Sequence, residues 1–67
     1  MEMKPIRSKL IDALSYDPQS RELTLYFADG HVGKFADVPE GVVLGLEIAR
    51  SPGGYYMSQI RDIYPRV

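Results

Sequence analysis

Residues 37–64 decide the fold, and they read DVPEGVVLGLEIARSPGGYYMSQIRDIY. Apolar residues recur at helical spacing from Pro39 onward, and proline is tolerated in a first helical turn because its missing N–H needs no partner there. Asp37 is the expected cap of this helix. The stripe that we expect to face the core consists of Val42, Leu46 and Ala49. The pattern therefore predicts a helix from Pro39 to about Ala49.

A second helix is predicted after a sharp turn. Residues 51–54, Ser-Pro-Gly-Gly, are expected to end the first helix and reverse the chain, because proline and glycine favour turns. Helical spacing then resumes from Tyr55 to Tyr64, with Tyr56 and Ile60 in register, and Pro65 stops it. The second half of the chain thus predicts two short helices joined by a glycine turn.

The first half of the chain predicts three antiparallel strands. Residues 6–16 are apolar on both sides, which implies either two covered faces or a bulge that exchanges the sides. Residues 17–20 form a turn in which Asp17 can bond the backbone ahead of it. Residues 23–27 alternate apolar and polar side chains, and Asp29-Gly30 closes a hairpin to a third strand at 31–36.

The expected fold is α+β: a three-stranded antiparallel β-meander followed by two short α-helices packed on one face, in the order β-β-β-α-α. We expect residues 1–67 to form a single domain, with residues 1–5 as a loosely ordered lead-in. The expected core consists of Ile11, Leu23, Leu25, Phe27, Val42, Leu46, Ala49, Tyr56 and Ile60.

The composition argues against several classes of protein. The formal net charge is −1, so the chain lacks the excess of basic residues that non-specific binding to nucleic acid requires. Without cysteine, the chain has neither disulfides nor thiolate metal ligands. No apolar run approaches the ~20 residues that span a bilayer, and the N-terminus lacks the apolar stretch of a signal peptide. We therefore expect a cytoplasmic protein without a membrane partner.

No catalytic or metal-binding pattern stands out. His31 is the only histidine, and a general base needs an oriented nucleophile within hydrogen-bond reach. Ser51 is better read as a hydroxyl that bonds the backbone than as a nucleophile. One histidine and scattered carboxylates offer no metal-ligand spacing. We predict no enzymatic activity, no cofactor and no metal.

An apolar seam on the first helix is the leading candidate for a binding surface. Leu44 and Ile48 lie almost opposite the core stripe of that helix. Either the second helix covers them, through Met57 or Tyr55, or they form an exposed seam that contacts a partner. In the second case, Leu44, Ile48 and Tyr55 would bind another protein or a second copy of this chain.

Basic and aromatic residues provide an alternative surface that would bind RNA or another single-stranded nucleic acid. With Lys4 nearby, its expected residues are Arg7, Lys9, Tyr26, Lys34, Phe35 and Arg50. The simpler reading of these charges is solvated strand edges, where lysines discourage pairing between sheets.

The chain resembles the KTSC domain, a module named for its occurrence at the C-terminus of some bacterial lysyl-tRNA synthetases and also found as stand-alone bacterial or phage proteins. The resemblance rests on Ser8, Ile11, Tyr16-Asp17, Leu23, Leu25, Phe27, Gly30, Val38-Pro39, Val42, Leu46, Ala49, Ser51, Gly53, Tyr56, Ile60 and Tyr64. It implies RNA binding, the usual suggestion for this family. The family's central Tyr-x-Tyr is replaced here by Gly33-Lys34-Phe35, so one aromatic ring is missing.

Together these patterns predict a small, non-catalytic binding module. We expect it to contact a protein partner or to form a homodimer through its helical surface. RNA binding, as the family resemblance implies, is the alternative.

Overall fold

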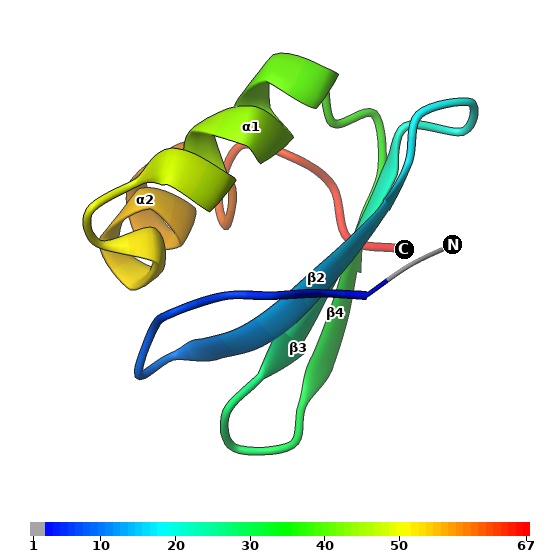
Figure 1. The fold of residues 1–67 in the computed structure, drawn as a ribbon. Helices are drawn as coiled ribbons and strands as arrows, with labels where there is room; N and C mark the ends of the chain where they lie inside the picture. Colours follow the sequence, from blue (N-terminus) through cyan, green and yellow to red (C-terminus); the bar gives the residue numbers. More distant parts are fainter. Residues whose placement is uncertain (1–2) are drawn as a thin grey trace.

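Along residues 3–67, which the computed structural model describes, four strands precede two helices. They are β1 (Lys4–Pro5), β2 (Ile11–Asp17), β3 (Glu22–Phe27), β4 (Val32–Phe35), α1 (Glu40–Ile48) and α2 (Pro52–Gln59). The strands form one antiparallel sheet in the order β1-β2-β3-β4. Both helices lie on one face of this sheet, as the α+β expectation requires (Figure 1).

The sheet contains one strand more than the sequence predicts. The additional strand, β1, pairs Lys4 with Leu14 and Pro5 with Ala13 on β2. A strand of two residues has no periodicity, so the sequence pattern gives no sign of it. Part of the expected lead-in therefore belongs to the sheet, while residues 1 and 2 lie outside the described residues.

The strand predicted for residues 6–16 begins only at Ile11. The hydroxyl oxygen of Ser8 accepts hydrogen bonds from the backbone N–H groups of Leu10 and Ile11, at 3.1 and 3.4 Å. A serine side chain that bonds the backbone in this way favours a turn over a strand. The serine therefore separates β1 from β2.

A bulge in β2 places Ile11 and Leu14 on the side of the helices. The register shifts between Ile11 and Ala13, so that Ile11 pairs with Phe27 and Leu14 with Leu25. The extra residue reverses the alternation, and Ile11 and Leu14 are both buried in the core. The bulge, one of the two predicted alternatives, is confirmed.

Both predicted turns between the strands are confirmed. Asp17 accepts a hydrogen bond from the backbone N–H of Gln19 at 2.9 Å, as expected of an aspartate that starts a turn. Gly30 has a φ of 95°, a conformation that glycine adopts without a steric penalty. The short turns leave the three longer strands as neighbours in the sheet.

The second helix begins earlier and ends earlier than predicted. It starts at Pro52, because Ser51 caps it by accepting a hydrogen bond from Gly54 N–H at 3.2 Å and proline suits the first helical turn. Both glycines therefore lie inside the helix. It ends at Gln59, and the chain continues as turns before Tyr64.

The first helix has nearly the predicted length but not the predicted cap. Its N-cap is Pro39, without a side-chain hydrogen bond. Asp37 instead has a φ of 58°, in the left-handed region, and serves the chain reversal that precedes the helix. Tyr16 fixes this connection by donating a hydrogen bond to the Val38 carbonyl at 2.6 Å.

The core lies between the sheet and the two helices. It consists of Ile11, Leu14, Leu23, Leu25, Phe35, Val38, Val43, Leu46, Tyr56 and Ile60. Phe27, Val42 and Ala49, which we expected in the core, are only half-buried. Val43 takes the place expected for Val42, because α1 turns its Val43–Leu46 side to the sheet.

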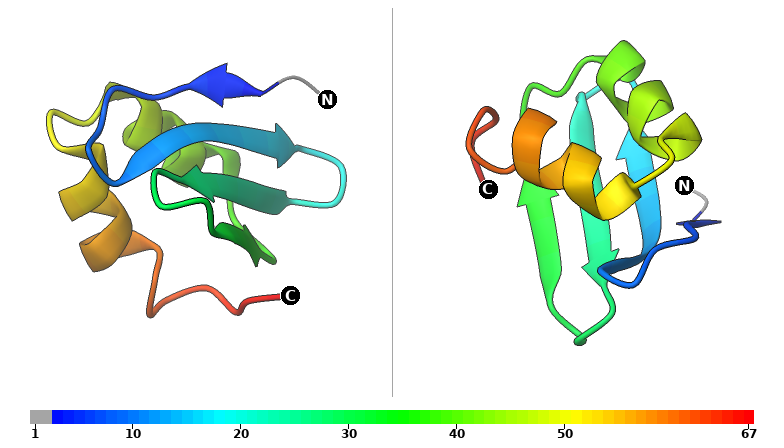
Figure 2. Two further views of the ribbon diagram at one scale, coloured as in Figure 1. Left: turned by 90° about the horizontal axis from the view of Figure 1, so that it is seen from below. Right: turned by 90° about the vertical axis from the view of Figure 1, so that its left-hand side faces the viewer.

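After α2 the chain returns to the sheet and runs beside β4 (Figure 2). Arg66 forms an antiparallel bridge with Phe35. Ala36 N–H donates to the Pro65 carbonyl, and Val67 N–H donates to the Lys34 carbonyl, each at 2.9 Å. This segment therefore covers part of the β4 edge. No helix formed by residues 3–67 has the length and apolar character needed to cross a membrane.

The contact between α1 and α2 depends on Gly45. A Cβ atom at this position would lie 2.8 Å from Cζ of Tyr55 and closer still to the Tyr55 hydroxyl oxygen. That hydroxyl donates a hydrogen bond to the Val42 carbonyl at 3.0 Å, which holds the ring in place. Glycine at position 45 is therefore required for the two helices to pack this closely.

Gly45→Ala should lower the free energy of unfolding by about 1–2 kcal/mol, because the cost of displacing Tyr55 exceeds the helix propensity gained. In a Tyr55→Ala background, the same substitution should raise the free energy of unfolding by about 0.5–1 kcal/mol. Gly41→Ala is the matched control: the site is open, and the change should stabilise by a similar amount. Urea denaturation measures all four variants. Equal stabilisation by Gly45→Ala and Gly41→Ala would contradict the role of Gly45.

Candidate functional site

The apolar seam on α1 is exposed. The exposed fractions of Leu44 and Ile48 are 53% and 82%, and these residues lie one turn apart. The core side of the same helix is formed by Val43 and Leu46. Of the two alternatives for this seam, the exposed one is found, because the second helix does not cover Leu44 and Ile48. We call Gly41, Leu44 and Ile48 the α1 face.

Tyr55 does not belong to this exposed surface. Its ring is half-buried against Gly45, and its hydroxyl group is hydrogen-bonded to the Val42 carbonyl. Tyr55 therefore joins α1 to α2. The side chain that we expected to contact a partner packs between the two helices instead.

Three of the predicted basic residues meet at one corner of the molecule. Arg7 and Arg50 line two neighbouring hollows of about 400 and 390 Å³ between the β1–β2 connection and the α1–α2 turn. Lys9 lines the second of these hollows. Lys4 borders the first, where its ammonium group lies 3.7 Å from the carboxylate of Glu47. We call Arg7, Lys9 and Arg50 the basic corner.

The other residues expected to bind nucleic acid lie elsewhere. Lys34 is on β4, across the sheet from β1. Tyr26 pairs with Ala13 and Val32, so it alternates with Leu25 and lies on the sheet face away from the helices. Phe35 is fully buried. It therefore offers no ring surface to a base, and the expected single surface of six residues is not formed.

The reason for the burial of Phe35 is an aromatic cluster in the core. The Tyr56 ring packs edge-on against Phe27 and Phe35, with centroid distances of 5.2 and 5.9 Å. Gly33 makes room for both phenylalanines, since a Cβ there would lie 3.2 Å from each ring. The guanidinium carbon of Arg66 lies 5.2 Å from the Phe35 ring centroid, within the range of a cation–π contact.

A cleft that the sequence analysis did not predict lies between the β3–β4 turn and α2. Its volume is about 400 Å³. Leu10, Phe27, Val32 and Met57 are its large aliphatic and aromatic lining residues besides Tyr56. We call it the hairpin cleft.

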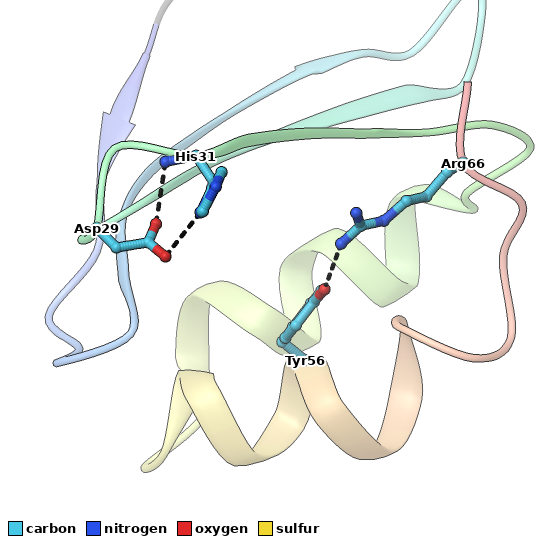
Figure 3. A network of polar contacts seen from close by, with 4 residues as sticks. All are labelled: Asp29, His31, Tyr56 and Arg66. Carbon is cyan, nitrogen blue, oxygen red and sulfur yellow. Dashed lines mark hydrogen bonds and ion pairs between the residues drawn. The ribbon is translucent and has the colours of Figure 1, made fainter.

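Charged and polar groups gather around the hairpin cleft (Figure 3). At one end, Asp29 accepts a hydrogen bond from His31 N–H at 2.9 Å, and its second carboxylate oxygen lies 2.7 Å from His31 Nδ1. At the other end, Arg66 donates a hydrogen bond to the Tyr56 hydroxyl at 3.1 Å. Arg61 also lines the cleft. These groups come from the turn, from α2 and from the C-terminal segment, so no local sequence pattern joins the two ends of the cleft.

Ser51 and His31 do not meet. Ser51 caps α2 and lines a hollow at the basic corner, whereas His31 lines the hairpin cleft. Within residues 3–67, no group of three or more histidine, aspartate or glutamate side chains is arranged to hold a metal ion. The described residues thus present three surface features: an apolar helix face, a cationic corner and a mixed cleft.

A small α+β domain of this kind, with four antiparallel strands covered by two helices on one face, has known relatives. The family model of the KTSC domain matches residues 7–64, and the chain belongs to the KTSC domain family. Among solved structures, the crystal structure of a KTSC domain protein from Yersinia pestis is similar, with a TM-score of 0.93 and 24% sequence identity. The match covers 98% of this chain and 93% of the Yersinia chain, and at this identity it shows the fold alone. No match was found among curated proteins.

The Asp29–His31 contact predicts a pH-dependent contribution to stability. The hydrogen bond from His31 N–H, and then the contact with its ring, lower the pKa of Asp29 below its ordinary value of 3.8. The folded protein therefore takes up this proton less readily than the unfolded chain. The stabilisation from Asp29 is complete above the unfolded-state pKa and is lost as the pH falls through the lowered pKa of the folded state.

Asp29→Asn should therefore reduce the urea midpoint at about pH 7, and the difference from the unsubstituted protein should shrink at about pH 2.5. Urea denaturation followed by circular dichroism at both pH values measures the difference. A difference in urea midpoint of the same size at both pH values would show that the carboxylate charge does not contribute to that difference.

Proposed function

We propose that this protein is a non-catalytic binding module that associates with a second copy of itself through the α1 face. The observation that carries the proposal is the exposure of Leu44 and Ile48, which lie one turn apart on the side of α1 opposite the core. Exposed large apolar residues on one helix face are typical of a contact surface. Gly41, exposed on the same face, lets a neighbouring helix approach closely.

The charges around the α1 face favour a second copy as the partner. In an antiparallel α1–α1 pair centred between Leu44 and Ile48, Glu40 lies about 9 Å from the two-fold axis along the helix. Arg50 follows the end of α1 at Ile48, on the other side of that axis. The two-fold rotation therefore places Glu40 of each copy at the same end of the pair as Arg50 of the other.

Glu47 is the acidic residue nearest the axis of such a pair, and its two copies would repel each other if unpaired. Its carboxylate already lies 3.7 Å from the Lys4 ammonium group. The pair therefore places opposite charges at its ends and a partly neutralised charge near its centre. The large apolar side chains of this face are few, so we expect a dissociation constant on the order of 0.1 mM, in the weak, transient class.

Sedimentation equilibrium tests the homodimer. Leu44→Glu and Ile48→Glu should each abolish association, because a buried unpaired carboxylate opposes it. Ile63→Glu is the matched control, since Ile63 is 58% exposed outside α1 and should leave association unchanged.

A charge exchange distinguishes the second copy from any other partner. Glu40→Arg and Arg50→Glu should each weaken the dimer several-fold, and the two together should restore it, since the contact is reciprocal. A double variant no stronger than the single variants, in a protein that still associates, would show that the α1 pair is not the contact. A protein that remains monomeric near 1 mM, about ten times the expected constant, would also contradict the proposal.

RNA binding at the basic corner is the second candidate, supported by the meeting of Arg7, Lys9 and Arg50. Cationic side chains at one corner bind phosphates by releasing counterions, so the affinity should fall steeply with salt. Arg7→Gln and Lys9→Gln should each weaken binding of a mixed-sequence single-stranded RNA and reduce the salt slope by about 0.7. Lys34→Gln, across the sheet, is the control for lost charge. Equal weakening by Lys34→Gln, measured by fluorescence anisotropy, would show that the corner is not the site.

A further inference from the structure

One end of the hairpin cleft presents hydrogen-bond donors that have no acceptor among residues 3–67. The Tyr56 hydroxyl oxygen accepts the hydrogen bond from Arg66, and its own hydrogen is donated to no other described residue. Tyr56 is only 4% exposed, and it is among the residues that line the cleft. The Arg66 guanidinium group has further N–H groups beside the one that bonds Tyr56. This end of the cleft is therefore suited to a ligand that accepts hydrogen bonds.

The charges around the cleft select the kind of acceptor. Arg61 and Arg66 are positive, while Asp29 is negative and Asp62 lies 3.4 Å from Arg61. With His31 neutral, these charges sum to zero. The positive potential in the cleft is therefore too low to favour a dianionic phosphate. A single carboxylate fits the planar guanidinium fork and the hydroxyl donor. Asp29 repels an anion from the opposite end, so the carboxylate would lie at the Arg66 end.

The rest of the cleft is apolar. Leu10 and Met57 are 38% and 49% exposed and line it together with the half-buried Phe27 ring. A ligand whose apolar group lies on these side chains removes them from water, and this gain adds to the carboxylate contact. The ligand is therefore amphipathic, with an apolar group close to its carboxylate.

The edge of β4 beside the cleft has free backbone groups. Lys34 and Ala36 direct their hydrogen-bonding groups outward to the C-terminal segment. Because the direction alternates along a strand, Val32 also directs its N–H and C=O outward. Outside the strand pairing, neither group of Val32 has a backbone partner among the described residues. The position can accept the main chain of an extended peptide, as other sheet edges do.

We propose that the hairpin cleft binds the apolar carboxyl-terminal residue of a peptide from a partner protein. The terminal carboxylate accepts hydrogen bonds from Tyr56 and Arg66. The terminal side chain lies on Leu10 and Met57, and the main chain continues along the β4 edge at Val32. The proposal uses no residue of the α1 face, so it is independent of the homodimer.

Nuclear magnetic resonance titration of the ¹⁵N-labelled protein tests the proposal. The probe is a hexapeptide that ends in phenylalanine with a free carboxylate, and the same peptide with a carboxamide end is its control. We expect the amide signals of Val32, Met57 and Arg61 to shift saturably with the free acid. The carboxamide should bind about ten-fold or more weakly, because it has no charge for Arg66.

Variants locate the carboxylate contact. Tyr56→Phe, which keeps the ring in the core, and Arg66→Met should each weaken binding of the free acid about five-fold or more. Tyr26→Phe and Arg7→Met are the matched controls outside the cleft and should leave the affinity unchanged. Should Arg66→Met fail to fold, Tyr56→Phe and the comparison of acid with carboxamide remain decisive.

Three outcomes would overturn the proposal. The first is binding of the carboxamide within about two-fold of the free acid. The second is an absence of saturable shifts around the cleft. The third is binding of 3-phenylpropionate as tightly as the peptide, which would assign the cleft to a free carboxylic acid instead.

Discussion

The packing of Tyr56 against the sheet is the contact on which the arrangement of the second helix depends. Its ring meets Phe27 from β3 and Phe35 from β4, and its hydroxyl group accepts a hydrogen bond from Arg66 in the C-terminal segment. One side chain therefore fixes α2, two strands and the returning chain relative to one another. Gly33 is a condition for this contact, because a side chain there would press on both phenylalanine rings. Gly33, which stands where the family's pattern has an aromatic residue, thus leaves the space that the core of this chain needs.

The close approach of the two helices determines which surfaces remain exposed. Gly45 allows Tyr55 to lie flat on α1 and to bond the Val42 carbonyl. With this side of α1 covered by Tyr55 and its core side by the sheet, Leu44 and Ile48 can only face away. The exposure of the α1 face is therefore a consequence of internal packing. A chain of this length has limited interior, so some large apolar side chains remain outside.

The sequence predicts the fold well where a local pattern determines it. The hairpin turns, the bulge alternative and α1 follow from alternation, from Asp17 and Gly30, and from a helical stripe. It fails where the local signal is short or ambiguous. The strand at Lys4–Pro5 has too few residues to show alternation, and the glycines after Ser51 suggest a turn although the serine cap and Pro52 start a helix there. In these cases strand pairing and helix capping outweigh the local preference of the residues for a turn or loop.

The candidate surfaces are less predictable because they join distant segments. Arg7 and Arg50 meet at one corner only because the β1–β2 connection packs beside the α1–α2 turn, while Lys34 lies across the sheet. In the proposed homodimer, Arg50 would take part in both the α1 pair and the basic corner, so occupation of one would weaken the other by removing a shared charge. The hairpin cleft shares only Leu10 with the hollows of the basic corner and no residue with the α1 face. A homodimer would therefore compete with RNA for Arg50 while both clefts of the pair stay open, and such a dimer could hold two peptide ends at once.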